Sequence, residues 1–362
     1  MTHIKEIEIK NFRGFDKLEI SNFGLINLIV GKNNCGKSSF LESIFLSIGM
    51  SNPMLPTNIN SFRGLTKSIE DLKYIFHKLK VDKVPSFSVL TDENINRSLE
   101  IRPIYKQNYK SDNIQPLSED EHIIMNTSSA IPSISGIDLN FTRKEKHKKV
   151  QKGKSSFSFV SGQEIKLDQD KNYQEKMNAI YIASDSKEKN ALPRYSEIVK
   201  RKKENVILSA LQKIDSKIVS IQALPDGLFI NHEDFNELIP SNLAGDGIRR
   251  YLNIVTTVAE KPNSIVLIDE IENGLHYSAH SSLWNSILSL SKELNIQLFI
   301  TTHNIETLKY FKEALEIDNL QSLQDKSMTY TLVHTKLEGI KAFSYSYEGF
   351  KEALEFDNEI RS

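Results

Sequence analysis

Eight consecutive residues near the start of the sequence combine glycines, a lysine and a serine at the spacing of a phosphate-binding loop. They read Gly31-Lys32-Asn33-Asn34-Cys35-Gly36-Lys37-Ser38 and match the pattern G-x-x-x-x-G-K-[ST] at every fixed position. Backbone N–H groups of such a loop surround the phosphates, and glycine lets the chain turn tightly enough. Lys37 would reach the β- and γ-phosphates, and the Ser38 hydroxyl would bind Mg²⁺. We therefore predict that residues 31–38, together with Ser39, bind a magnesium-bound nucleoside triphosphate.

The sequence on either side of this loop fits the strand and the helix that the motif needs. Residues 25–30 form a short apolar run typical of a buried strand, and residues 39–46 have the apolar spacing of one helix face. A helix that begins directly after the loop points its positive end at the phosphates. A chance match to the pattern would lack this context, so we favour the phosphate-binding interpretation.

Two adjacent carboxylates, Asp269 and Glu270, follow an apolar run over residues 265–268. That run predicts a buried parallel strand, and ligands of α/β sheets bind where such strands end. Asp269 would there hold Mg²⁺ through water, and Glu270 would orient or deprotonate the attacking water. A strand that merely ends in a charged turn is the alternative, and the upstream phosphate loop argues against it.

His303 ends another strand-like run, over residues 297–302. A lone histidine is more often structural than catalytic. This histidine, however, would lie at the same sheet edge as the two carboxylates, where it could sense the γ-phosphate. From the residues alone, both roles stay open.

The composition is that of an ordinary globular protein. The 362 residues are 39% hydrophobic and 26% charged, and they include 46 basic and 47 acidic side chains. Net charge therefore favours no partner, and any contact with nucleic acid must come from a local patch. The single cysteine, Cys35, excludes an internal disulfide. With no apolar run near the ~20 residues that span a bilayer and no secretory signal, we expect a cytoplasmic protein without a membrane segment.

The remaining pattern predicts a nucleotide-binding core interrupted by a β-rich lobe. Core strands are expected at 4–11, 15–20, 25–30, 178–183, 217–223, 227–231, 328–334 and 340–346, and lobe strands at 86–90, 98–104, 136–141, 156–160 and 164–167. Helices are expected from the phosphate loop to about 49, and at 69–79, 193–213 and 247–260. Loops rich in Asn, Ser, Asp and Pro separate the lobe strands, and we expect poor order at 108–130.

Four stretches together resemble the ABC-type ATPase heads of the OLD-like group, which is related to SMC-like DNA-repair ATPases and includes many anti-phage ATPases. They are Asn11-Phe12-Arg13-Gly14-Phe15, the phosphate loop, Asp269-Glu270-Ile271-Glu272-Asn273-Gly274-Leu275-His276 and Thr301-Thr302-His303. The resemblance implies an α/β fold, a P-loop NTPase of ABC/SMC-like head type with an inserted, mostly antiparallel β lobe. The head would comprise residues 1–50 and 177–362, and the lobe residues 51–176.

The resemblance also implies that two heads sandwich ATP, so that hydrolysis depends on dimerisation. The signature loop offered to the partner would be residues 243–250, with Gly245, Asp246 and Gly247 at the γ-phosphate. Ala244 stands where a serine is expected, which removes one hydroxyl contact. A simple glycine turn that opens a helix is the alternative. Residues 272–276 match the loop that usually touches the partner head, and His303 matches the switch histidine. Ser184 and Asp185 are candidates for the glutamine loop.

The implied function is an ATP-hydrolysing dimer or higher homo-oligomer that gates a separate partner in phage defence or DNA maintenance. About sixty residues follow His303, too few for an added nuclease domain of ordinary size. We therefore expect a separate effector, such as a Toprim-like nuclease or a toxin, as in PARIS-type systems. An ATP-locked sensor or scaffold with little hydrolysis is the alternative. A transporter subunit is disfavoured because about two hundred residues, including a β lobe, separate Lys37 from Gly245.

A basic segment at residues 143–154, expected to form a hairpin tip, is the strongest local charge feature. Such a run is usually a solvated loop. The alternative is a contact with the phosphates of DNA, or with an acidic partner such as a phage protein, and that contact would be salt-sensitive. A second basic run, 200–203, is expected to be one solvated turn of a helix.

Overall fold

A six-stranded, mostly parallel sheet forms the centre of the molecule. In the computed structural model, which describes residues 2–65, 68–105, 134–159, 164–184, 191–335 and 338–355, its strand order is β16-β15-β3-β14-β13-β9. The strands are β3 (Ile26–Val30), β9 (Ala179–Ile182), β13 (Ile265–Ile268), β14 (Gln297–Thr301), β15 (Ser327–Thr335) and β16 (Gly339–Ser346). Only β16 pairs with its neighbour in the antiparallel direction.

This sheet separates two hydrophobic cores. Successive residues of a strand point to opposite faces, so Val266 and Ile268 enter one core while Ile265 and Leu267 enter the other. Because both faces are covered, every residue of β3, β13 and β14 is buried. The first core also contains side chains of α3 (Ala191–Lys200), α4 (Glu204–Gln212), α5 (Asp246–Glu260), α6 (Tyr277–Leu294), α7 (Ile305–Leu315) and α8 (Tyr347–Glu355).

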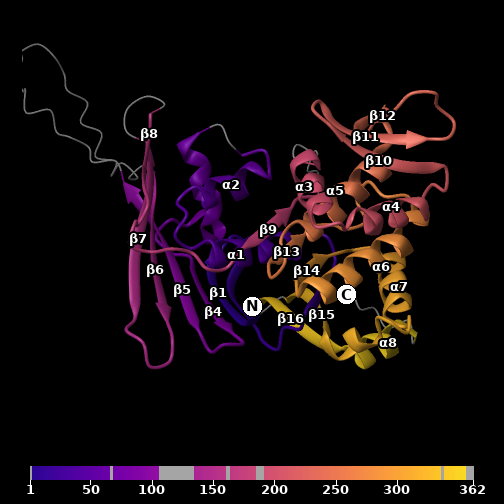
Figure 1. Ribbon diagram of the computed structural model, residues 1–362. Helices are drawn as coiled ribbons and strands as arrows, with labels where there is room; N and C mark the ends of the chain where they lie inside the picture. The colour runs from indigo at the N-terminus through magenta and orange to yellow at the C-terminus, as the bar shows by residue number, and fades with distance from the viewer. Residues whose placement is uncertain are drawn as a thin grey trace, which may run out of the picture.

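The second core lies between the central sheet and a seven-stranded antiparallel sheet. The helix α1 (Lys37–Ile48) runs through this core, and Figure 1 shows the large sheet beside it in indigo to magenta. The large sheet has the order β2-β1-β4-β5-β6-β7-β8. Its strands are β1 (Ile4–Phe12), β2 (Phe15–Ile20), β4 (Ser86–Thr91), β5 (Asn96–Tyr105), β6 (Ile134–Lys144), β7 (Gln151–Phe159) and β8 (Ile165–Asp168).

The predicted β lobe thus continues a sheet that begins with the first two strands of the chain. Strand β1 pairs with β2 on one side and with β4 on the other. The expected strands of the lobe and the antiparallel pairing are confirmed, and so is the basic hairpin tip, between β6 and β7. The predicted loop 108–130 lies outside the described residues.

Three helix predictions need correction. The segment 193–213 is two helices, because Lys202 adopts a left-handed φ of 56° between α3 and α4. The run 200–203 is therefore a turn, tied down by ion pairs of Lys200 with Glu197 and of Lys203 with Glu293. The segment 69–79 forms two 3₁₀ helices, η1 (Ile69–Ile75) and η2 (His77–Leu79). A helix that the periodicity did not indicate, α2 (Leu55–Ser61), carries a proline in its first turn, where the missing N–H is harmless.

A small third sheet covers the far end of the first core. It consists of β10 (Ile218–Leu224), β11 (Gly227–His232) and β12 (Ile239–Pro240), followed by the 3₁₀ turn η3 (Ser241–Leu243). Figure 1 shows it above α3, α4 and α5. Together with the central and antiparallel sheets, these elements confirm the predicted α/β fold with a mostly antiparallel β lobe. The last 3₁₀ helix, η4 (Gln321–Lys326), leads into β15.

Candidate functional site: an ATP-binding sheet edge

The phosphate loop closes around the side chain of Lys37. Its Nζ donates to the carbonyl oxygens of Gly31, at 2.8 Å, and Lys32, at 2.9 Å. Gly36 precedes α1 with a φ of 92°, and a Cβ there would lie 2.9 Å from the ring of Phe15. Only glycine meets both conditions, the left-handed backbone and the close contact. The loop therefore has the form that the motif predicts, with its ammonium group fixed inside.

The start of α1 is suited to an anion. The helix begins at Lys37, directly after the loop, and its first turn contains no acidic residue. The residue before the helix, Gly36, has no side chain that could cap these first N–H groups. Unpaired N–H groups and the positive end of the helix macrodipole favour phosphate at this point.

The structure brings together the two predicted magnesium ligands, although 231 residues separate them in sequence. Ser38 Oγ donates to Asp269 Oδ1 at 3.1 Å, and Thr301 Oγ1 donates to the same oxygen at 2.7 Å. Asp269 itself is buried. A hydroxyl and a carboxylate oxygen are ligands that Mg²⁺ accepts together with phosphate oxygens. Ser38 and Asp269 therefore fit a magnesium ion beside the phosphate loop.

Tyr181 is a site residue that the sequence analysis missed. Its hydroxyl donates to Asp269 Oδ2 at 3.4 Å. Burial raises the pKa of Tyr181 well above its usual value, which keeps the proton on the hydroxyl. Its ring stacks on Phe62 with centroids 4.9 Å apart and also contacts Phe45. The second oxygen of Asp269 is therefore oriented by a tyrosine that α1 and the end of α2 hold in place.

Glu270 stands at a strained turn directly after β13. Its φ is 47°, a left-handed value that costs energy for a residue with a side chain. Its N–H donates to Thr301 Oγ1 at 2.7 Å, so one threonine contacts both predicted acidic residues. The side chain of Glu270 is partly exposed. The turn thus presents a carboxylate to solvent beside the magnesium pair, as the orientation of a water molecule requires.

His303 lies next to the same edge and contacts Glu272. The ring Nδ1 is 3.0 Å from Glu272 Oε1, and the backbone N–H of His303 donates to the same oxygen at 3.0 Å. The resemblance placed Glu272 in the loop that touches the partner head and did not pair this glutamate with His303.

The predicted signature loop is exposed and opens α5. Gly245 has a φ of 91°, and a Cβ there would meet no atom within 4 Å. The preceding Leu243 is 73% exposed. Asp246 is the first residue of α5, and a Cβ on Gly247 would lie 3.8 Å from the carbonyl oxygen of Gly274. The loop is thus open to another molecule on one side and packed against the segment that follows Glu270 on the other.

Arg250, the last residue of the predicted signature stretch, joins α5 to the ends of two central strands. Its guanidinium donates to the carbonyl oxygens of Ala183, at 2.9 Å, and Asp269, at 3.2 Å. Arg250 is buried, so these bonds are shielded from water. The start of α5 and the acidic strand end are therefore joined directly within the subunit.

A charge cluster around the buried Glu42 lies next to the start of α1, behind the phosphate loop in sequence. Glu42 of α1 forms ion pairs with Arg13 at 2.6 Å and Arg63 at 2.8 Å, and Arg63 also donates to Ser39 Oγ at 3.2 Å. Burial raises the pKa of Glu42, opposed by both arginines, and lowers the pKa of Arg13 to about 10. Arg13 belongs to the predicted Asn11–Phe15 motif, so the motif supplies a countercharge to Glu42.

Two further predicted residues play smaller parts. The thiol of Cys35 is buried, and burial raises its pKa, which makes it a poor nucleophile. The carbonyl oxygen of Ser184, a candidate for the glutamine loop, accepts a bond from Asn273 Nδ2 at 3.0 Å. Asp185, the other candidate, lies outside the described residues.

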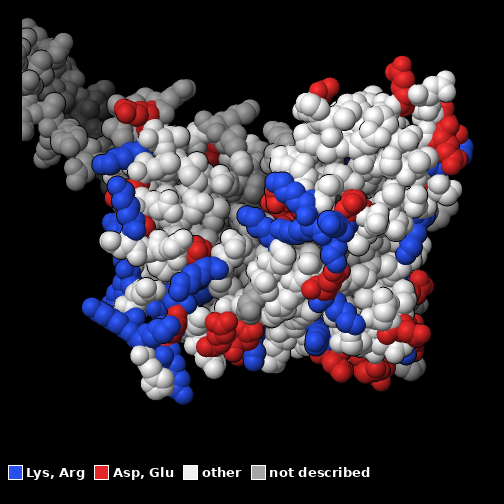
Figure 2. Space-filling model, viewed as in Figure 1, with Lys and Arg blue, Asp and Glu red and all other residues white. Residues whose placement is uncertain are grey.

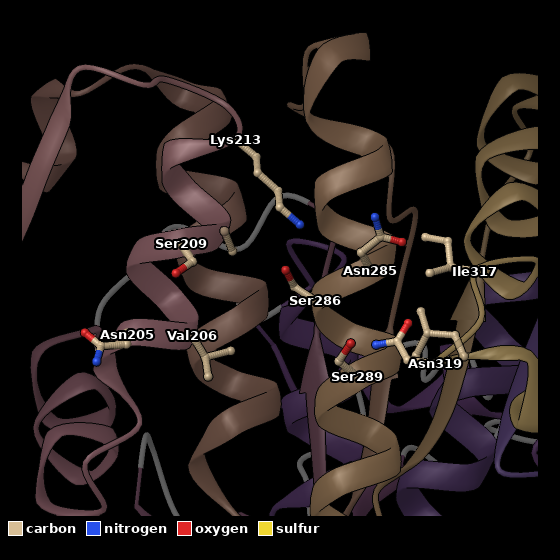
Figure 3. A pocket seen from close by; sticks show the side chains of 11 residues that line it. Asn205, Val206, Ser209, Lys213, Asn285, Ser286, Ser289, Ile317 and Asn319 are labelled. Carbon is tan, nitrogen blue, oxygen red and sulfur yellow. The ribbon is translucent and has the colours of Figure 1, made fainter.

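A separate cavity of about 450 Å³ lies between α4, α6 and the segment after α7. Figure 3 shows Lys213, Ser209, Asn285 and Asn319 around it. No residue of the phosphate loop or of the acidic strand end lines this cavity.

The comparison with protein families supplies the decisive observation. The family model of the AAA ATPase domain matches residues 3–307. The chain belongs to this ATPase family. The predicted ABC-type ATPase head is thereby confirmed, whereas the assignment to the OLD-like group stays a prediction.

Curated relatives match this ATPase over most of its length. The "ATP/GTP phosphatase" of Helicobacter pylori is 26% identical over 338 residues, which cover 86% of this chain and 88% of the relative. The "DNA replication and repair protein RecF" of Streptococcus pyogenes serotype M49 is 24% identical over 373 residues, or 87% and 95% of the two chains.

Solved SMC heads are similar in structure. The head domain from Thermotoga maritima has a TM-score of 0.44 at 10% identity, covering 95% of this chain and 99% of that one. An Smc head bound to the C-terminal domain of ScpA, from Pyrococcus furiosus, has a TM-score of 0.49 at 14% identity, covering 99% and 100%. Every helix in the described residues of this ATPase is too short or too polar to span a bilayer.

Proposed function

We propose that this ATPase hydrolyses ATP between two copies of itself and thereby gates a separate effector protein in phage defence or DNA maintenance. The observation that carries the proposal is the convergence of Ser38, Asp269 and Glu270: Ser38 donates to Asp269, and the Thr301 hydroxyl contacts both Asp269 and the backbone N–H of Glu270. Phosphate loop, metal ligand and water-orienting carboxylate then share one sheet edge, which is what phosphoryl transfer to water requires. The single, reduced cysteine agrees with a cytoplasmic location.

Each group has a defined task in this reaction. Lys37 and the N–H groups at the start of α1 hold the β- and γ-phosphates, and Glu270 orients the attacking water and accepts its proton. Mg²⁺, held by Ser38 and Asp269, supplies charge neutralisation on the phosphate oxygens when it is bound. Tyr181 and Thr301 fix the Asp269 carboxylate by hydrogen bonds. The protein contributes mainly position and preorganised charge.

Dimerisation is supported by the open side of the signature loop. The exposed Leu243 and the uncovered Gly245 are features of a surface that another molecule can cover. A second head is the proposed occupant, because its phosphates would present negative charge to the start of α5. The bonds of Arg250 then link each subunit's acidic strand end to the loop that it offers its partner.

The partner class is proposed from relatives and from charge. The RecF relatives are described as DNA replication and repair proteins, which supports a role near DNA. Figure 2 shows Lys and Arg gathered over the β6–β7 side of the antiparallel sheet. That hairpin carries Lys148, Lys149 and Lys152 near its tip. DNA or an acidic phage protein would fit this surface, and a Toprim-like nuclease or a toxin remains the proposed effector.

The substitution Glu270→Gln tests the proposal. We expect phosphate release to fall about a hundredfold or more, because the amide cannot take the proton of the attacking water, while ATP binding persists. Light scattering should then show an ATP-dependent dimer that the wild type forms only transiently. The exposed Glu233→Gln serves as the matched control and should behave as wild type.

The same experiment separates hydrolysis from the scaffold alternative, which Ala244 favours because it lacks the expected hydroxyl. Equal rates near zero in wild type and Glu270→Gln would support an ATP-locked scaffold. A Glu270→Gln variant that stays monomeric with ATP would contradict the sandwich.

A further inference from the structure

A buried carboxylate supports the exposed switch histidine. The side chain of Glu272 is 8% exposed, whereas that of His303 is 44% exposed. One oxygen, Glu272 Oε1, accepts the backbone N–H of His303 and lies 3.0 Å from its ring Nδ1. The glutamate therefore holds both the backbone and the ring of the histidine.

This contact decides which ring nitrogen carries the proton. An ionised carboxylate accepts hydrogen bonds and cannot donate them. At 3.0 Å from Oε1, Nδ1 must be the donor, so the ring is in the Nδ1–H form. Nε2 is then the nitrogen that can act toward the nucleotide. When neutral it accepts from water, and when protonated it donates to a phosphate oxygen.

Glu272 also belongs to a row of bonds between the ends of β13 and β14. The N–H of Glu270 donates to Thr301 Oγ1 at 2.7 Å, and the N–H of Ile271 donates to the Thr301 carbonyl oxygen at 3.2 Å. The bond between His303 N–H and Glu272 is the third in this row. The histidine and the water-orienting glutamate are thus held in one frame, so a shift of either one displaces the other.

We propose that Glu272 is a positioning residue for ATP hydrolysis: it fixes the Nδ1–H tautomer of His303 and aims Nε2 at the nucleotide. The proposal rests on the proposed hydrolysis at this edge. In this role Glu272 orients the histidine ring by a hydrogen bond and does not itself react, as carboxylates beside functional histidines commonly do. The resemblance to known heads gave His303 a role but named no partner within the same subunit.

The tautomer can be read directly in the full-length protein without nucleotide. In ¹⁵N-histidine-labelled protein, two-bond ¹H–¹⁵N correlation spectra distinguish Nδ1–H from Nε2–H rings. His303 is assigned as the ring signal that disappears in His303→Asn. We expect Nδ1–H in the wild type and in Glu272→Gln, whose amide oxygen still accepts, and loss of that preference in Glu272→Leu. A wild-type Nε2–H ring would overturn the proposal, whether or not the Glu272 variants fold.

Kinetics provide the second readout. Glu272→Leu should lower kcat about 10- to 100-fold, the usual cost of losing a supporting carboxylate, with the KM for ATP changed less than about twofold. Glu272→Gln should recover most of the rate. The double variant Glu272→Leu/His303→Asn should be no slower than His303→Asn alone, because the two residues act as a unit. Additive losses would overturn the proposal.

Two controls isolate this effect. Glu306→Gln removes an exposed carboxylate from the first turn of the neighbouring α7 and should leave both the tautomer and kcat unchanged. Absence of hydrolysis by the wild type would refute the proposed function instead, and the spectrum of His303 would still decide the role of Glu272.

Discussion

The two large sheets of this ATPase are built from different strands and do different work. In the central sheet, β3, β13 and β14 are buried at every position. In the antiparallel sheet, strands such as β4 alternate between buried and partly exposed residues. Strands that are covered on both faces can end together at a protected edge, where a few polar groups meet. The half-solvated sheet supplies surface instead. We therefore expect the chemistry at the edge of the first sheet and the partner contacts on the second.

A buried arginine joins the helix that begins at the phosphate loop, α1, to the antiparallel sheet. Arg97 of β5 donates to the carbonyl oxygens of Ser47 and Ile48 at the end of α1 and forms an ion pair with Glu175 at 2.7 Å. A cation at this position complements the negative end of the helix. The helix that begins at the phosphate loop is thus fastened at its other end to the antiparallel sheet.

The largest expected effect comes from Lys37→Ala in the central region. Loss of the ammonium group that the loop encloses should reduce hydrolysis roughly a hundred- to a thousandfold and abolish measurable ATP binding by titration calorimetry. Lys154→Ala on the antiparallel sheet removes a lysine of the same charge and should leave the rate unchanged. Equal losses in the two variants would erase the proposed division of work.

Breaking the junction should destabilise both regions. Arg97→Ala leaves Glu175 without its buried partner, and we expect a loss of about 3 kcal/mol in the free energy of unfolding. Arg102→Ala, on the same strand but in an exposed pair with Glu100, should cost less than about 1 kcal/mol. Urea denaturation followed by circular dichroism measures both. Indistinguishable midpoints would mean that Arg97 does not join the two regions.

The surface role of the antiparallel sheet is tested at the basic hairpin. Replacing Lys148, Lys149 and Lys152 with serine should weaken binding to duplex DNA about tenfold at low salt. The slope of the logarithm of the binding constant against the logarithm of the salt concentration should become shallower by up to about three units. Phosphate release without DNA should not change. Fluorescence anisotropy over a salt series measures the binding. The control is Lys203→Ser, in the basic turn between α3 and α4. Unchanged affinity would leave the hairpin as a solvated loop.

The smallest effect concerns pH and a histidine of the central region. Burial lowers the pKa of His280 from 6.5, so below about pH 6.5 the unfolded chain binds a proton more readily than the folded one. Stability should therefore fall as the pH drops from 7 to 5. His280→Phe, which keeps the stacking on Tyr310, should lessen that fall, whereas His334→Phe at an exposed position should not. Thermal melting at several pH values measures the difference. If the wild type and His280→Phe lost stability in parallel as the pH fell, the predicted role of His280 would be wrong.

The sequence predicted elements whose signals are local. A window of about ten residues is enough to recognise the phosphate loop, the strand that ends in Asp269 and Glu270, and the strand before His303. The apolar spacing gave a wrong prediction of local structure where a single residue changes the direction of the backbone. The left-handed Lys202 divides a segment whose amphipathic spacing predicted one continuous helix.

The sequence by itself determined which residues are the candidates for the chemistry, because glycines, a lysine and paired carboxylates have few other uses at these spacings. Only the tertiary structure decided how they are held: Thr301 and Tyr181 on Asp269, Arg250 across two strand ends, and Glu272 beneath His303. Those contacts depend on the order and register of strands that are far apart in the chain. Strand order arises from the burial of whole sheet faces, and no short stretch of sequence encodes it.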